Sequence, residues 1–143
     1  MTTRYDSDFY GWTQEQANLL RSGNLEQLDT ENLLEEIEAM GRSERRELRS
    51  RLEILLAHLL KWRYQANRRG RSWELTIEEQ RDKAAECLKE SPSLRNKLDE
   101  HLGKAYIAAR RLAEKETMIN QNVFPATCPW TFEQIMDENF WPE

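Results

Sequence analysis

The sequence predicts an all-α fold, a bundle of about four main helices closed by an aromatic C-terminal strap that carries a short helix. Glycine and proline number only five and four in 143 residues, too few for an all-β fold with many tight turns. Apolar residues recur at helical spacing through most of the chain. Hydrophobic residues make up 38% and charged residues 33%, a balance typical of amphipathic helices rather than of a disordered chain.

The chain length predicts one helical domain over residues 1–143, with the bundle at about 6–118 and the strap at about 119–143. No apolar run approaches the roughly 18 residues of a membrane span, and the start, MTTRYDSDFY, lacks the features of a secretion signal. We therefore expect a soluble, cytoplasmic protein without a membrane partner. Cys87 and Cys128 lie far apart without CxxC spacing, which indicates neither a zinc knuckle nor a disulfide scaffold.

The first helix is expected to begin at a cap on Asp6 and to run to about Ser22, where Gly23 stops it. Its predicted inner face includes Trp12 and Gln16. A hydrophobic staple with Leu28 and Leu33 predicts that the next helix starts near residue 30.

This second helix is very long, from about residue 30 to about residue 67, where arginines precede Gly70. Its apolar stripe keeps its phase across Gly41, which favours one continuous or mildly kinked helix over a break. In that case Gly41 would let a neighbouring helix approach closely. The residues on the predicted inner face are Leu33, Leu34, Ile37, Gly41, Glu44, Leu48, Leu52, Leu55, Leu59 and Trp62.

Two more helices and the strap complete the bundle. Ser72 or Thr76 is expected to cap a helix that ends near residue 90. Ser91 and Pro92 then form an N-cap and first-turn pair that opens a helix to about residue 117. In the strap, Thr131 and Gln134 make a capping box for a short helix at about 131–138.

Polar side chains interrupt the apolar faces of four helices, at Gln16, Glu44, Arg81 and His101. Because an unpaired buried charge costs several kcal/mol, we infer that Glu44 pairs with Arg81, with His101 and Gln16 nearby. One interpretation is a satisfied polar network that fixes the register of the bundle. The other is an acid/base or anion-binding site, for which Glu44, Arg81 and His101 are the candidate catalytic residues.

The two histidines offer a weaker possibility of a metal site. His58, His101 and Glu36 supply the two imidazoles and one carboxylate that catalytic metals in helical bundles use. Neither histidine, however, belongs to an ExxH or HxxxH motif. No cofactor is predicted.

Charge is distributed unevenly. Residues 1–41 carry two basic and nine acidic side chains, whereas residues 42–71 carry ten basic and three acidic ones. These blocks can satisfy each other within the fold or across a dimer, or the basic block can contact phosphate. Aromatic rings interleave the basic stretch 61–71, as in nucleic-acid contacts, although the whole chain is acidic. Its candidate contact residues are Lys61, Arg63, Arg68, Arg69 and Arg71.

Several segments resemble an uncharacterised, mainly cyanobacterial helical family catalogued as domain of unknown function twenty-nine. They are YDSDFYGWTQEQANLLRSG, LDTENLLEEIEAMGRSERRELRSRLEILLAHLLKW, SWELTIEEQR, SPSLRNKL and FPATCPWTFEQIM. Together they span nearly the whole chain. The resemblance implies an all-helical fold and a bacterial, mainly cyanobacterial, source. It implies no activity, cofactor or catalytic residue.

The leading hypothesis for function is a non-catalytic module that binds protein partners or associates with itself. A first alternative is an enzyme or a ligand- or metal-binding bundle that uses Glu44, Arg81 and His101. A second is nucleic-acid binding through the stretch 61–71. The chain contains no GxSxG motif and no phosphate-binding glycine loop, so no motif specifies a reaction.

Overall fold

The computed structural model describes residues 4–143, in which every regular element is helical and no strand occurs. The predicted all-α class is therefore confirmed. The chain divides into two compact units, one ending at Arg42 and the other running from Ser43 to Glu143. Within the described residues, none of the helices is long and apolar enough to cross a membrane.

The first unit contains α1 (Arg4–Ser7), α2 (Phe9–Ser22), the 3₁₀ turn η1 (Leu25–Gln27) and the start of α3 (Thr30–Tyr64). The cap of α2 is Asp8, whose Oδ1 accepts a hydrogen bond from the backbone N–H of Gly11 at 3.0 Å. The predicted cap at Asp6 is wrong, because Asp6 already lies within the separate turn α1. Gly23 ends α2 as predicted, with a φ of 77° that glycine adopts without strain.

Trp12 is the centre of the first unit. Only 3% of it is exposed, and its Nε1 donates to Oδ2 of Asp29 at 3.0 Å. Oε1 of Gln16, one turn further along α2, accepts from the backbone N–H of Asp29 at 2.8 Å. Asn32 also donates to Oδ2 of Asp29, at 2.7 Å. These bonds fix the loop that leads from α2 into α3.

Helix α3 is continuous from Thr30 to Tyr64, and the predicted passage through Gly41 is confirmed. The predicted close neighbour at Gly41 is wrong for this single chain. Among residues 4–143, and apart from the adjoining residues and backbone of α3 itself, no atom lies within 4 Å of a Cβ built at this glycine. The helix ends three residues before the predicted Asn67, and a 3₁₀ turn, η2 (Ala66–Arg68), follows it.

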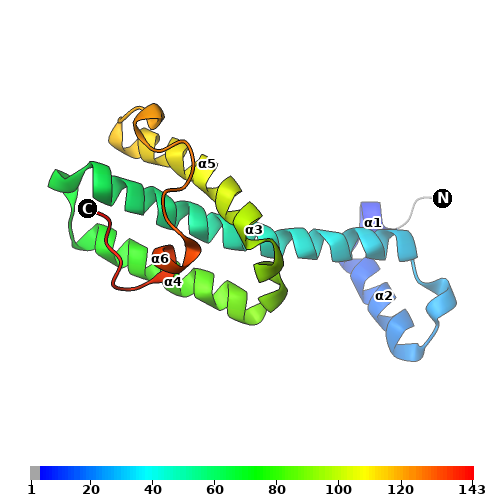
Figure 1. Cartoon of the computed structure of the whole chain (residues 1–143). Coiled ribbons are helices and arrows are strands. Elements are labelled where there is room, and N and C mark those ends of the chain that lie inside the picture. Colours follow the sequence, from blue (N-terminus) through cyan, green and yellow to red (C-terminus); the bar gives the residue numbers. More distant parts are fainter. Residues whose placement is uncertain (1–3) are drawn as a thin grey trace. The chain divides into compact units, whose positions relative to one another are not determined.

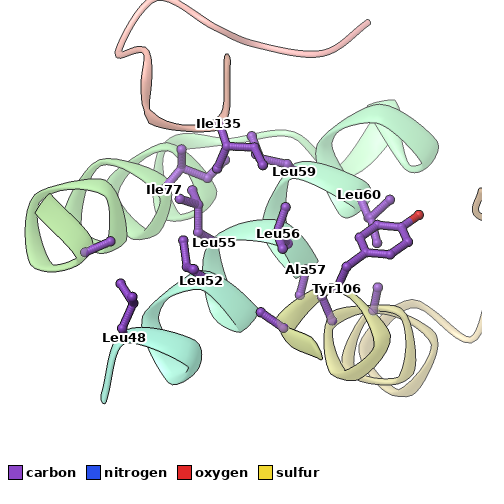
Figure 2. Close-up of a cluster of buried hydrophobic side chains, with 14 of the residues drawn as sticks. Leu48, Leu52, Leu55, Leu56, Ala57, Leu59, Leu60, Ile77, Tyr106 and Ile135 are labelled. Carbon is purple, nitrogen blue, oxygen red and sulfur yellow. The ribbon is translucent and has the colours of Figure 1, made fainter. Parts of the chain in front are cut away.

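The second unit packs the C-terminal part of α3 against α4 (Arg71–Glu90), α5 (Leu98–Thr117) and the strap with α6 (Phe132–Met136) (Figure 1). Figure 2 shows side chains from these four elements converging on one apolar core. Its fully buried members include Leu48, Leu52, Leu55, Leu56, Ala57, Leu59, Leu60, Ile77, Tyr106 and Ile135.

Local signals in the second unit are confirmed in part. Thr131 and Gln134 form the predicted capping box of α6. Ser91 and Pro92 open a 3₁₀ segment, η3 (Pro92–Lys97), before α5 begins, rather than an α-helix. Helix α4 starts after Gly70 without a side-chain cap, so neither predicted cap is used.

The strap closes the core of the second unit. It starts with the turn η4 (Gln121–Val123), after which Phe124 is 2% exposed, and Ile135 of α6 is fully buried. The ring of Trp141 lies 4.7 Å from that of Trp62 on α3. The aromatic residues of the strap thus cover apolar side chains of α3, as aromatic rings do in helical cores.

Candidate functional site

Arg81 on α4 holds the strap. It is 4% exposed, and its guanidinium donates from Nε to the carbonyl oxygen of Ile135 at 2.8 Å and from Nη2 to that of Phe140 at 2.7 Å. The same group lies 5.4 Å from the centroid of the Trp141 ring. Burial lowers its pKa, while the carboxylates of Asp137, Glu138 and Glu78 act in the opposite direction. The partners of Arg81 are therefore backbone carbonyls and an aromatic ring.

Glu44 is exposed on α3, so the predicted buried pair with Arg81 is wrong. The two residues line different surface grooves. Glu44 lines a groove of about 300 Å³ with Arg51, Lys83 and Cys87, whereas Arg81 lies in the groove between α4 and the strap. Glu44 shares the helical period of the buried leucines of α3. These buried leucines begin only at Leu48, one turn after Glu44.

His101 on α5 is 2% exposed and hydrogen-bonds to a residue outside the predicted cluster. Its Nδ1 accepts from Nε of Arg49 on α3, at 3.1 Å. Burial, and then the charge of Arg49, lower its pKa. The imidazole is therefore held in its neutral form with the proton on Nε2. Its contact with Arg49 joins α3 to α5.

The predicted cluster of four polar residues is not assembled as one site. Gln16 bonds to Asp29 in the first unit, Glu44 is exposed, Arg81 holds the strap and His101 pairs with Arg49. Each buried member has a structural partner of its own. The catalytic role of Glu44, Arg81 and His101 remains a prediction that has lost the shared pocket on which it was based.

The predicted metal ligands do not form a metal-binding group. Nδ1 of His58 lies 2.9 Å from the carbonyl oxygen of Ile54, in the preceding turn of α3. Glu36 belongs to the first unit, where its Oε1 accepts from the hydroxyl of Tyr5 at 2.5 Å. Across residues 4–143, no three His, Cys, Asp or Glu side chains are arranged to hold a metal ion.

Among the five candidate cations of the basic stretch 61–71, the described structure buries Lys61. Lys61 is 6% exposed, and its Nζ donates to Oε2 of Glu116 at 2.5 Å while lying 4.8 Å from the Trp73 ring centroid. Nε of Arg69 donates to the carbonyl of Trp62 at 2.6 Å. Arg71 pairs with Glu74 at 3.2 Å. Lys61 is therefore not available to a nucleic acid, whereas Arg69 and Arg71 are exposed.

Arg63 and Arg68, the other two candidate nucleic-acid contacts, are exposed. The guanidinium of Arg63 lies 5.5 Å from the ring centroid of Tyr64. The four exposed arginines, with Arg69 and Arg71 included, are fewer than the six or more phosphate contacts of strong binders. Nucleic-acid binding remains a prediction.

The groove beside Arg81 is a polar recess that borders a buried charge. Its volume is about 530 Å³, and its lining includes the carboxylates of Glu78, Asp82 and Glu138. Nη1 of Arg81 is buried without a hydrogen-bond partner among the described residues. The carboxylates suit a cationic group at the rim, and the arrangement brings no imidazole or nucleophile beside them.

An apolar surface on α3 in the first unit is the feature that remains to be explained. Leu34 is 57% exposed, Ile37 62% and Met40 65%, and their spacing of three residues keeps them on one side of the helix. We call these three residues the α3 stripe. Leu34 and Ile37 were predicted to face the core, and that prediction is wrong. Side chains of this size at such exposure on successive turns are typical of a surface that another molecule covers.

A family model described as Domain of unknown function DUF29 matches residues 4–141, nearly the entire chain. The chain belongs to this family. Neither a curated protein nor a solved structure matches it. The predicted family is thus confirmed, and the match assigns no activity and no functional residue to the DUF29 fold.

The sequence did not predict the contacts or the exposure of three residues of this DUF29 chain, Arg49, Glu116 and Met40. Arg49 bonds to His101 across 52 positions, and Glu116 bonds to Lys61 across 55. Neither contact joins the acidic block 1–41 to the basic block 42–71, so the uneven charge distribution did not indicate them. Met40 was also missed, because it lies at the edge of the predicted stripe, and only its 65% exposure shows that it belongs to an apolar surface.

Proposed function

We propose that this protein is a non-catalytic interaction module whose α3 stripe, Leu34, Ile37 and Met40, binds another polypeptide chain. The observation that carries the proposal is the exposure of these three side chains on two successive turns of an otherwise charged helix segment. Burial of apolar surface is the main driving force of protein association. Removing all three from water would provide the apolar centre that such interfaces have.

The geometry of the α3 stripe suits a helical partner. Residues spaced by three along a helix present a narrow apolar ridge, which packs into the groove of a second amphipathic helix. Acidic side chains flank the ridge at Glu31, Glu35 and Glu38, all exposed. A charged rim around an apolar centre favours specificity and orientation of the partner.

The alternatives have less support. The candidate catalytic residues Glu44, Arg81 and His101 do not share a groove, and Lys61 of the basic stretch is buried against Glu116.

We also propose that the protein works in the cytoplasm. Cys87 and Cys128 are both free thiols within the described chain, which suits a reducing compartment.

A photo-crosslinking side chain at position 37 tests the proposal in cells of the source organism. The matched control carries the same group in place of Ile107, which is 52% exposed on α5. We expect covalent adducts with a second polypeptide from the substitution at Ile37 and few from that at Ile107. Equal yields from both positions, or none from Ile37, would contradict an interaction surface on the α3 stripe.

A further inference from the structure

The first unit buries almost none of its own apolar side chains. Among residues 4–42, Trp12 is the one apolar side chain that is buried, and the apolar core lies in the second unit. The first unit ends at Arg42, near the size of about 40 residues below which a chain rarely supplies a sufficient core by itself. Its exposed large apolar residues are Phe9, Tyr10, Leu20, Leu25, Leu34, Ile37 and Met40. The α3 stripe thus belongs to a unit that leaves much of its apolar surface uncovered.

One edge of the α3 stripe is bordered by the first unit itself. At about 100° per residue, Glu36 lies about 40° round the helix from Met40, on the side away from Leu34. The carboxylate of Glu36 accepts a hydrogen bond from the hydroxyl of Tyr5, which belongs to α1. A partner that covers the stripe therefore meets α1 at this edge and has more freedom at the other.

The other edge of the α3 stripe is acidic. Glu31 lies about 60° and Glu38 about 40° beyond Leu34, on the side away from Met40. Glu31 precedes Leu34 by three positions and Glu38 follows it by four, so both are its neighbours on the helix surface. Both are exposed, and across residues 4–143 neither forms an ion pair, although Arg42 follows Glu38 by one turn. This edge thus presents an apolar side chain between two unpaired carboxylates.

The charge of the surrounding segment has the same sign. Residues 1–41 carry nine acidic and two basic side chains. Of the two basic ones, Arg4 pairs with Glu15 at 3.5 Å, and Arg21 donates a hydrogen bond to the side chain of Asn18. Both basic groups therefore have partners on α2. The excess negative charge attracts a cationic partner and repels an anionic one, such as a nucleic acid or an anionic lipid surface.

We propose that the α3 stripe binds a basic amphipathic helix of another protein. Apolar side chains of that helix cover Leu34, Ile37 and Met40, and its lysine or arginine side chains pair with Glu31 and Glu38. This inference rests on the proposed function and adds the charge of the partner. Apolar burial supplies most of the affinity, whereas the ion pairs select a basic over an acidic helix and orient it on the stripe.

Two designed peptides provide the probe for this charge preference. Each forms a helix of about five turns with leucines at the same helical spacing, and its polar face carries lysine in one peptide and glutamate in the other. Fluorescence anisotropy measures the Kd of each peptide for the full chain. We expect the lysine peptide to bind at least about tenfold more tightly at low salt. The difference should shrink at about 1 M salt, where exposed charges are screened within about 3 Å.

Charge reversal assigns the preference to the acidic edge. The double variant Glu31→Lys with Glu38→Lys should bind the lysine peptide at least about tenfold more weakly than the wild type, and the glutamate peptide more tightly. The matched control is Glu86→Lys with Glu90→Lys, two exposed positions on α4 that also form no ion pair within the described chain. Because both double variants have the same net charge, the control should keep the preference of the wild type. Circular dichroism checks that the helices are intact.

Two outcomes overturn this inference. One is a glutamate peptide that binds the wild type as tightly as the lysine peptide does. The other is an equal change of the two affinities in the α3 and α4 double variants, which would mean that the preference reflects net charge alone.

The proposed function is judged separately by photo-crosslinking at Ile37. An adduct whose cross-linked segment is a basic amphipathic helix supports both proposals. An adduct with an acidic segment, or with a second copy of this chain, overturns the basic partner but leaves the interaction module. If cross-linking captures nothing and Ile37→Lys binds the lysine peptide as tightly as the wild type does, both proposals fail.

Discussion

Nε of Arg81 donates to the carbonyl oxygen of Ile135 at 2.8 Å, and this bond ties helix α4 to a strap residue 54 positions later. We expect Arg81→Ala to destabilise the protein by about 3 kcal/mol, because it leaves the carbonyls of Ile135 and Phe140 without their charged donor. Urea unfolding followed by circular dichroism measures the loss. Arg111→Ala, at an exposed position on α5, serves as the control. An Arg81 variant as stable as this control would show that the strap does not need the guanidinium.

His101 makes stability depend on pH near neutrality. Burial and Arg49 lower its pKa in the folded protein below the ordinary value of 6.5, so the unfolded chain takes up the proton first as the pH falls. Its contribution to stability is fully present above about pH 6.5 and is lost as the pH drops below that value. Free energies of unfolding from about pH 7.5 to about pH 5.5 should fall more steeply in the wild type than in His101→Gln.

Some slope should remain in the His101→Gln variant, because burial also lowers the pKa of His58. Replacing both histidines should remove most of the pH dependence in this range. Identical slopes in the wild type and the double variant would mean that neither imidazole is held neutral by the fold.

Lys61 and Glu116 form the most buried ion pair of the described structure, with Lys61 itself only 6% exposed. Glu116→Ala should cost about 1–2 kcal/mol, since it leaves an ammonium group buried but the lost carboxylate was partly in solvent. Glu79→Ala is the matched control, because Glu79 forms an exposed pair with Lys83 one turn along α4. That control should lose less than about 0.5 kcal/mol. Equal losses in chemical denaturation would contradict the difference in burial.

Tyr5 should titrate abnormally late. Its hydroxyl donates to the carboxylate of Glu36, and this bond raises its pKa to about 12. A pKa raised in the folded state means that the contribution to stability is fully present below the ordinary value of 10.0 and is lost as the pH rises through about 12. Tyrosine resonances followed by NMR in Glu36→Gln should show this phenol returning toward 10.0. Tyr106, whose pKa burial also raises to about 12, should not change.

Much of the fold could be predicted because its signals are local. Gly23 ends α2, Thr131 and Gln134 cap α6, and the apolar period runs through Gly41 without a change of phase. Each of these features depends on residues within a few positions of one another. The positions at which helices start were predicted less accurately, as at Asp8 and at the 3₁₀ segment after Ser91. At these positions alternative backbone hydrogen-bond patterns compete with one another.

The polar cluster could not be predicted for two physical reasons. The hydrogen-bond partners of Arg81 are backbone carbonyls, which every residue carries and no sequence pattern distinguishes. The helical period also shows which side of α3 a residue occupies, but not how far along the helix other elements cover that side. Leu34 and Ile37 share the period of Leu48 and Leu52, yet the former two are exposed and the latter two are fully buried.

The chains captured at the α3 stripe test the central claim most directly. Photo-crosslinking from position 37 is compared in the protein with an intact stripe and in the double variant Leu34→Lys with Met40→Lys, and Ile107→Lys serves as an exposed control on α5. The account predicts adducts with a second polypeptide for the intact stripe and for the Ile107 variant, and loss of these adducts for the double variant. No adduct from the intact stripe, or an equal yield from the double variant, would contradict it.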